Sequence, residues 1–87
     1  MPSRCDKLLK QAKNSSDSLR YKDACYLAEC YGFVFERQVG SHRIFKHPKS
    51  KRLLNFQPDD SKAKGYQVKE LLTAINELSK LEDETEG

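Results

Sequence analysis

Residues 33–57 read FVFERQVGSHRIFKHPKSKRLLNFQ, and this stretch decides the fold. Its apolar and polar residues alternate with the period of two that is typical of a strand with one buried face. It divides into three runs rich in β-forming residues: 33–39, 42–47 and 52–57. Gly40 and Ser41 separate the first two runs, and Pro48 opens the turn before the third. Connections this short predict an antiparallel meander.

The segment before the strands has the helical period of 3.6. Residues 21–31 predict a helix, and Gly32 follows where a glycine commonly ends one. One face of this helix is apolar: Ala24, Leu27, Ala28 and Tyr31. Farther upstream, residues 2–13 predict a short leader helix with Ser3 as its N-cap, and the polar cluster NSSDS separates the two helices.

The segment after the strands predicts a third helix. A polar loop, PDDSKAKG, leads to residues 66–81, whose apolar stripe is Val68, Leu71, Leu72, Ile75 and Leu78. Residues 82–87, EDETEG, contain no apolar side chain and predict an unfolded acidic tail. We therefore expect one domain over residues 1–81, with the order α-α-β-β-β-α. Helices on one face of a three-stranded antiparallel sheet make a two-layer α+β fold.

The charges are distributed unevenly. The chain has 16 Lys and Arg against 13 Asp and Glu, a net charge of +3. Without the acidic tail, 16 basic residues face nine acidic ones, so the body of the domain carries +7. Between Arg37 and Lys64 there are eight basic residues and only two acidic ones, Asp59 and Asp60. This excess is typical of a surface that binds a polyanion.

The cysteines and the apolar content indicate the compartment. The chain has three cysteines, Cys5, Cys25 and Cys30, an odd number with no CxxC pair. This pattern favours neither a disulfide framework nor a zinc ribbon. We therefore expect the protein in a reducing cytoplasm. Cys25 and Cys30 are interpreted as small packing residues. No apolar run approaches the roughly 18 residues of a membrane span, and the N-terminus lacks the features of a signal peptide.

Several motifs carry a resemblance to a known family. The last five elements, α-β-β-β-α, follow the order of the double-stranded-RNA-binding domain (dsRBD). Four stretches narrow this further: Gly32-Phe33, RQVGSHRIFKHP (37–48), LLNFQP (53–58) and KAKGYQVKELL (62–72). In these stretches the sequence resembles the HicA family of toxins from bacterial toxin–antitoxin pairs. The resemblance covers roughly residues 19–80.

The resemblance implies a dsRBD-like toxin that cleaves messenger RNA with one essential histidine and is silenced by a HicB-type antitoxin. By its position in the motif, that histidine is His42. Many members carry a second histidine beside the first, and Arg43 stands at that place here. No cofactor and no membrane partner are implied, and the RNA is expected to be single-stranded or structured.

The residues themselves support the same chemistry. A neutral imidazole, with an ordinary pKa near ~6.5, can take a proton from a ribose 2′-hydroxyl and return it to the leaving 5′-oxygen. On a strand, His42, Ile44 and Lys46 share one face. Nearby turn and basic residues are candidate RNA contacts: Gly40, Ser41, Arg43, Lys46, Lys49, Lys51, Lys62 and Lys64.

Other sites are less favoured. His42 and His47 point to opposite faces of their strand, which argues against a paired-histidine site, and the scattered ligand types predict no metal centre. His47 is interpreted as structural, and Ser41 lacks a base and an orienting acid that would make it a nucleophile. The tyrosines could stack on bases, but their helical spacing favours packing: Tyr21, Tyr26, Tyr31 and Tyr66.

Two alternatives of another class remain at this point. The chain could be an inert RNA-binding module that keeps the fold and the basic surface. It could also be a protein-interaction domain that uses the sheet and has no RNA role. Whether His42 matters for turnover or only for affinity separates the toxin from the first alternative, and failure to bind any RNA at any salt concentration would favour the second.

Overall fold

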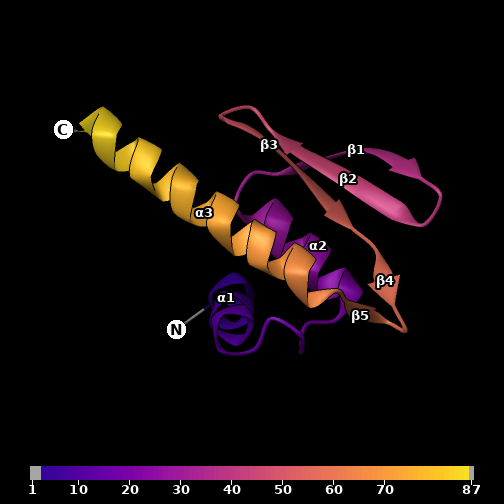
Figure 1. Ribbon diagram of the computed structural model, residues 1–87. Coiled ribbons are helices and arrows are strands. Elements are labelled where there is room, and N and C mark those ends of the chain that lie inside the picture. Colours follow the sequence, from indigo (N-terminus) through magenta and orange to yellow (C-terminus); the bar gives the residue numbers. More distant parts are fainter. Residues whose placement is uncertain (1–2, 87) are drawn as a thin grey trace.

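The structure is a computed structural model, and it describes residues 3–86. The ends of the predicted leader helix and acidic tail, Pro2 and Gly87, lie outside the described residues. Three helices, a three-stranded sheet and a small two-stranded hairpin follow one another along the chain (Figure 1). The predicted order α-α-β-β-β-α is confirmed, with the hairpin as an addition before the last helix.

The leader helix is present as α1, Arg4–Asn14. Ser3 caps it, because its Oγ accepts the Asp6 backbone N–H at 3.2 Å while the Asp6 carboxylate accepts the Ser3 N–H at 3.3 Å. Leu8 and Ala12 are buried in the core. The helix is therefore packed as part of the domain.

The second helix, α2, covers Tyr21–Cys30. It ends as the sequence predicts, because Gly32 adopts φ 92° and its N–H bonds to the Glu29 carbonyl at 3.1 Å. Ala24, Leu27 and Ala28 are fully buried, which confirms the predicted apolar face.

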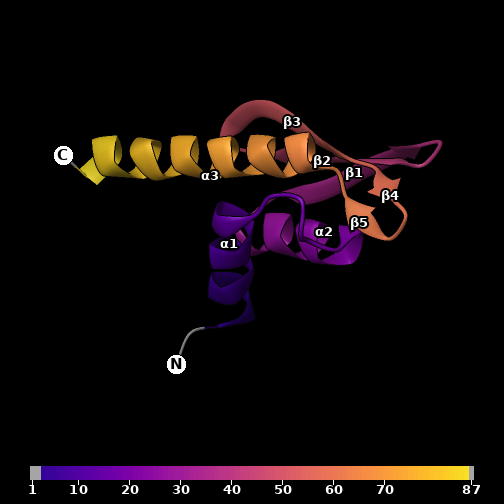
Figure 2. The same cartoon turned by 60° about the horizontal axis from the view of Figure 1, so that its bottom comes forward.

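The sheet is the expected antiparallel meander. Its strands are β1, Val34–Val39; β2, His42–His47; and β3, Ser50–Phe56, in the order β1-β2-β3. Phe45 and its cross-strand neighbour Leu54 are buried on the face that the helices cover, together with Phe56. Within residues 3–86 no helix lies over the opposite face (Figure 2), so the predicted two-layer α+β architecture is confirmed.

A small hairpin replaces the predicted polar loop. β4, Pro58–Asp59, pairs with β5, Lys62–Ala63, and Lys62 also bridges to Arg20. The turn places Asp60 and Ser61 at φ 57° and 79°. Strands of two residues show no periodicity, and the turn lacks the glycine that usually occupies positive φ, so neither sequence signal was available.

The last helix, α3, covers Gly65–Glu86, and its C-terminal part extends beyond the other elements (Figures 1 and 2). Val68 and Leu71 of the predicted stripe are fully buried, and Leu72, Ile75 and Leu78 pack partly against the core. The prediction of an unfolded tail is wrong for residues 82–86, which continue the helix. Extending a helix that packing has already nucleated needs little apolar content, and Glu is a good helix former.

The cysteine interpretation is also wrong in part. Cys5 of α1 and Cys30 at the end of α2 form a disulfide with their Cα atoms 6.1 Å apart. Spacing along the sequence gives no sign of this pair, because the packing of α1 against α2 brings the two residues together. Cys25 is buried as expected, and burial raises the pKa of its thiol to about 11.

No helix in residues 3–86 combines the length and the apolarity that crossing a membrane requires.

Candidate active site

His42 stands at the start of β2 on the open face of the sheet. The strand alternates as predicted: Phe45 is buried under the helices, whereas His42, Ile44 and Lys46 face away from them. The two-residue turn Gly40-Ser41 precedes it, with Gly40 at φ 62°. Positive φ at the first turn position only is the pattern of a type II′ hairpin, which needs glycine there. The turn thus holds the imidazole at the end of the sheet, where it is partly exposed.

Asn55 of β3 fixes the orientation of this imidazole. His42 Nδ1 lies 3.0 Å from Asn55 Oδ1, and an amide oxygen can only accept, so the Nδ1–H donates. In the neutral ring the proton then sits on Nδ1, and Nε2 keeps its lone pair. The His42–Asn55 pair therefore presents a proton acceptor to solvent on the open face.

Sequence reasoning missed Asn55. Its backbone pairs with Ile44, which places its side chain diagonal to His42 on the same face. The signal lies in the strand register, because a polar residue that faces out beside the histidine is recognisable only once β2 and β3 have been aligned.

A buried glutamine anchors the strand that carries Asn55. Gln67, at the start of α3, is only 5% exposed, and its Oε1 accepts the backbone N–H of Gln57 at 2.8 Å. Gln57 lies two residues after Asn55. The contact ties the end of β3 to α3, so Gln67 supports the site through the backbone.

Basic side chains on the open face are partly engaged with an acid. Lys46 and Arg37 both lie 3.8 Å from Glu36 Oε1. Lys46 is four residues from His42 along the strand, roughly 13 Å away. Arg37 pairs with Ile44 and is thus diagonal to His42 on the other side from Asn55. By the register, the backbone of Arg37 is nearer to His42 than that of Lys46, and Arg37 was not among the predicted contacts.

Arg43, in contrast, lies on the covered face. Its guanidinium carbon is 5.8 Å from the centre of the Tyr21 ring and 5.9 Å from that of Phe35. Such distances are typical of cation–π contacts. The structure therefore does not bring Arg43 onto the face that presents His42.

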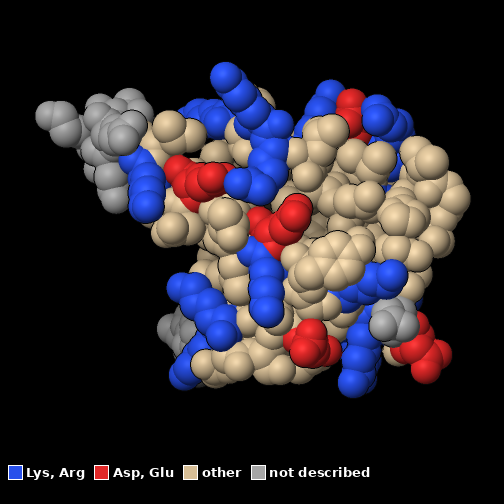
Figure 3. Space-filling view, in the orientation of Figure 1, with Lys and Arg blue, Asp and Glu red and all other residues tan. Residues whose placement is uncertain are grey.

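The predicted lysines lie in two places. Lys49 and Lys51 flank the β2–β3 turn, at the opposite end of the sheet from His42. Lys62 and Lys64 line a hollow of about 720 Å³ beside the start of α3, together with the acids Asp17 and Asp60. On the face that carries α3, blue basic side chains are scattered with red acidic ones between them (Figure 3). The lysines do not form one cluster around His42.

His47 has a structural environment. Its Nδ1 accepts the backbone N–H of Lys49 at 2.9 Å, and its ring packs edge-on against Phe33 with centroids 5.1 Å apart. A Cβ on Gly32 would meet His47 Nε2 at 2.8 Å. His47 thus packs closely against the chain that leaves α2.

The tyrosines lie mostly in packed surroundings. Tyr21 and Tyr31 are partly buried against the core, and burial raises the pKa of both phenols. Tyr26 lies under the Arg4 guanidinium, 4.5 Å from its ring centre. Tyr66 is 60% exposed and receives a hydrogen bond from Gln67.

The described residues contain no group of three His, Cys, Asp or Glu side chains that could hold a metal ion. Metal-independent cleavage stays a prediction, because the arrangement of protein ligands alone does not test it.

Comparison with models of known protein families gives a match. The family model described as "HicA toxin of bacterial toxin-antitoxin" matches residues 21–76, more than half of the chain. The match begins at the first residue of α2 and ends within α3, so it includes the whole sheet, His42 and Asn55. No curated protein matches the chain.

Proposed function

The chain belongs to the HicA family of toxins from bacterial toxin–antitoxin systems, and from this premise we propose that it is an mRNA-cleaving endoribonuclease that needs no metal ion. The proposed general acid and base is His42. As a HicA toxin, the protein has an antitoxin partner, and we propose that this partner is of the HicB type.

The hydrogen bond between His42 and Asn55 carries the proposal. It leaves Nε2 as a proton acceptor at an exposed site where an RNA strand can approach. An enzyme that transfers protons with a single histidine needs the ring held in one tautomer and one orientation. Asn55 supplies both, and Gln67 stabilises the strand end beside it.

The proposed reaction needs only groups of the RNA and this side chain. His42 Nε2 takes the proton of a ribose 2′-hydroxyl, and the oxygen attacks the neighbouring phosphorus. The bond from phosphorus to the 5′-oxygen breaks, and the protonated imidazole returns its proton to that leaving oxygen. The products are a 2′,3′-cyclic phosphate and a free 5′-hydroxyl.

Cations near the site can stabilise the phosphorane. Arg37 is diagonal to His42, and Lys46 lies farther along the same face. Both side chains form an ion pair with Glu36 at 3.8 Å. These pairs are exposed and therefore weak, so a phosphate could bind the two cations in place of Glu36. The backbone N–H groups at Gly40 and Ser41 are further proposed phosphate contacts. Arg43, Lys51, Lys62 and Lys64 are more distant candidates for binding the rest of the strand, whereas Lys49 lines a groove on the other side of the molecule and is not assigned to RNA.

The open face also has the character of a protein interface. Val34, Val39 and Leu53 are 55%, 57% and 52% exposed; Val39 pairs with His42, and Val34 pairs with Lys46 farther along the strand. Exposed apolar side chains of this size favour a protein partner. We propose that the antitoxin covers this face and thereby keeps RNA from His42. Mixing toxin and antitoxin should abolish cleavage, and a bound antitoxin that leaves cleavage intact would contradict this arrangement.

Messenger RNA as the substrate places the proposed activity in the cytoplasm. Disulfides are rare there because glutathione and thioredoxin keep thiols reduced. The Cys5–Cys30 pair joins α1 to α2, away from His42, so the proposed activity does not depend on its redox state.

The test is cleavage of a labelled single-stranded RNA in EDTA by purified wild type, with His42→Ala prepared in parallel. We expect wild type alone to release fragments with 2′,3′-cyclic phosphate ends. Fragments with 3′-hydroxyl ends, or cleavage only after Mg²⁺ is restored, would contradict the mechanism. No cleavage by either protein, with equal RNA binding, would favour the inert RNA-binding module.

A further inference from the structure

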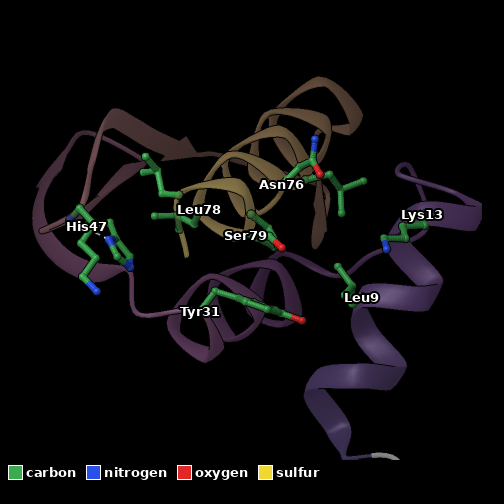
Figure 4. Close-up of a pocket in the computed structure, with 11 residues that line it drawn as sticks. Leu9, Lys13, Tyr31, His47, Asn76, Leu78 and Ser79 are labelled. Atoms are coloured by element: carbon green, nitrogen blue, oxygen red, sulfur yellow. Dashed lines mark hydrogen bonds between the residues drawn. The ribbon is translucent and has the colours of Figure 1, made fainter. Parts of the chain in front are cut away.

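A groove of about 1250 Å³ lies on the side of the molecule away from the open face. It runs between α3 on one side and α1 with the end of α2 on the other. Figure 4 shows Tyr31, Leu78 and Ser79 facing the same space, with His47 at one end and Lys13 at the other. None of the residues that hold His42 lines this groove, so it is a separate surface.

Much of the groove is built from segments outside the family match. The match covers residues 21–76, whereas Leu9 and Lys13 come from α1 and Leu78 and Ser79 from the later part of α3. The part of the chain that matches the family supplies the rest of the lining on both sides. The groove is thus a feature that this chain adds to the catalytic domain.

The α1 wall is firmly attached. Leu8 and Ala12 bury the inner side of the helix whatever the redox state of Cys5 and Cys30, and the disulfide, when oxidised, adds a covalent link to the end of α2. Arg4 adds an ion pair to Asp23 of α2 at 2.8 Å. A wall fixed in this way is preorganised, which lowers the entropy cost of binding.

The groove has an apolar floor and basic ends. Leu72, Ile75 and Leu78 form one stripe of α3, and Leu9 faces them from α1. Lys13 and Lys49 lie on the rim. Among the described residues that line the groove there is no Asp or Glu. From Leu72 to Leu81, α3 offers roughly 14 Å of lining, the length of two to three helical turns.

We propose that this groove binds an acidic amphipathic helix of a partner protein. An apolar stripe would lie on the floor, as in other complexes of a helix in a groove, and flanking carboxylates would meet Lys13 and Lys49. A second copy of the chain fits less well, because residues 1–81 carry a net charge of +7. RNA also fits less well, because Tyr31 is the only tyrosine or phenylalanine in the lining of the described chain.

The test uses three synthetic helical peptides of about three turns, measured by fluorescence anisotropy with the full chain. The first has a leucine stripe flanked by glutamates, the second replaces the glutamates by lysines, and the third replaces the leucines by serines. We expect the first to bind at least about tenfold more tightly than the others. Equal binding of all three, or no binding of the first, would overturn the proposal.

Charge-reversal variants locate the binding. Lys13→Glu/Lys49→Glu should weaken the acidic peptide at least about tenfold. The matched control Lys22→Glu/Lys69→Glu has the same net charge but changes exposed lysines outside the groove, and it should retain most of the affinity. Equal weakening by both variants would contradict binding in the groove. All four positions are on the surface, so melting curves should confirm that each variant folds.

Two further measurements exclude other occupants. We expect the free chain to be monomeric by light scattering, and we expect single-stranded RNA not to displace the acidic peptide. A dimer that Lys13→Glu/Lys49→Glu dissociates would assign the groove to a second copy. Displacement by RNA that this same variant abolishes would assign it to RNA. Either result would overturn the proposal, independently of whether His42 cleaves RNA.

Discussion

The two histidines of this protein lie on one strand, five residues apart, in opposite surroundings. His42 is on the open face, where its Nδ1 bonds to the side chain of Asn55. His47 is on the covered face, packed on Phe33 and Gly32 and bonded to the backbone of Lys49. The alternation of a strand sends them to different sides, and the neighbours on each side decide what each can do.

The two histidines have opposite neutral tautomers. A side-chain oxygen accepts from His42 Nδ1 and leaves Nε2 basic toward solvent. A backbone N–H donates to His47 Nδ1, so the proton of that neutral ring is on Nε2, which faces the chain at Gly32. One ring is arranged to exchange a proton with a ligand, and the other to fill space.

On the covered side of the molecule, we expect the largest loss of stability from removal of the disulfide. Cys5→Ser/Cys30→Ser opens a link between residues 25 apart in sequence, and we expect a loss of about 3 kcal/mol in the free energy of unfolding. Cleavage measured below the unfolding transition should be unchanged. Urea denaturation with and without dithiothreitol checks this, and identical midpoints for oxidised and reduced wild type would contradict it.

Asn55→Ala tests the open side. Without its acceptor the His42 ring can rotate and change tautomer, so we expect kcat to fall on the order of ten- to a hundredfold with little change in KM. Stability should be nearly unchanged, because Asn55 is exposed. Single-turnover cleavage measures the effect, with Asn76→Ala, another exposed asparagine, as the matched control. Full kcat in Asn55→Ala would remove it from the site.

Substitution of two glycines by alanine compares the stability cost of an added Cβ in packed and in open surroundings. Gly32→Ala keeps φ 92° and drives a Cβ against His47, so we expect a loss of about 2 kcal/mol in stability. Gly40→Ala keeps φ 62° with no atom within 4 Å, and about 1 kcal/mol is expected. Thermal melts measure both. Equal losses would mean that the contact with His47 adds nothing.

The smallest change concerns the exposed pair of Arg52 and Glu77, which joins β3 to α3. Both guanidinium contacts are 3.1 Å, and the Arg52 hydrogen bond lowers the pKa of Glu77. The pair therefore stabilises the fold above the ordinary pKa of a glutamate, and its contribution is lost as the pH falls through the lowered value. Arg52→Ala should lower the melting temperature slightly at pH 7 and leave it unchanged at low pH. A difference that persists in acid would be unexpected.

Much of the fold could be predicted from period and turn chemistry. Strong alternation in 33–57 and the glycines at 32 and 40 were sufficient for the meander and the end of α2. The 58–63 hairpin was not predictable, because its two-residue strands show no periodicity and its turn has no glycine. The Cys5–Cys30 disulfide was not predictable either, because it depends on the packing of two segments that are distant in sequence. Composition alone mispredicts residues 82–86, because they extend a helix that packing of the preceding residues has already formed.

The candidate site was predictable only in part. The motif and the strand period place His42 on one face and His47 on the other. Asn55 and Arg37, which lie near His42, come from the two adjacent strands. Their distance from His42 depends on the register of these strands against β2. Arg43 follows His42 directly in the sequence, but its guanidinium contacts the rings of Tyr21 and Phe35 on the covered face. Closeness in sequence therefore does not place Arg43 at the site.

The most direct test of this account compares His42→Ala with His47→Ala. Both are assayed on the same RNA in EDTA, at a temperature where melting curves show each variant folded. We expect His42→Ala to lose on the order of 10²- to 10⁴-fold in kcat with an unchanged melting temperature. His47→Ala should keep kcat and melt earlier. Equal losses of cleavage in the two folded variants, or full cleavage by His42→Ala, would contradict the assignment of chemistry to the open face.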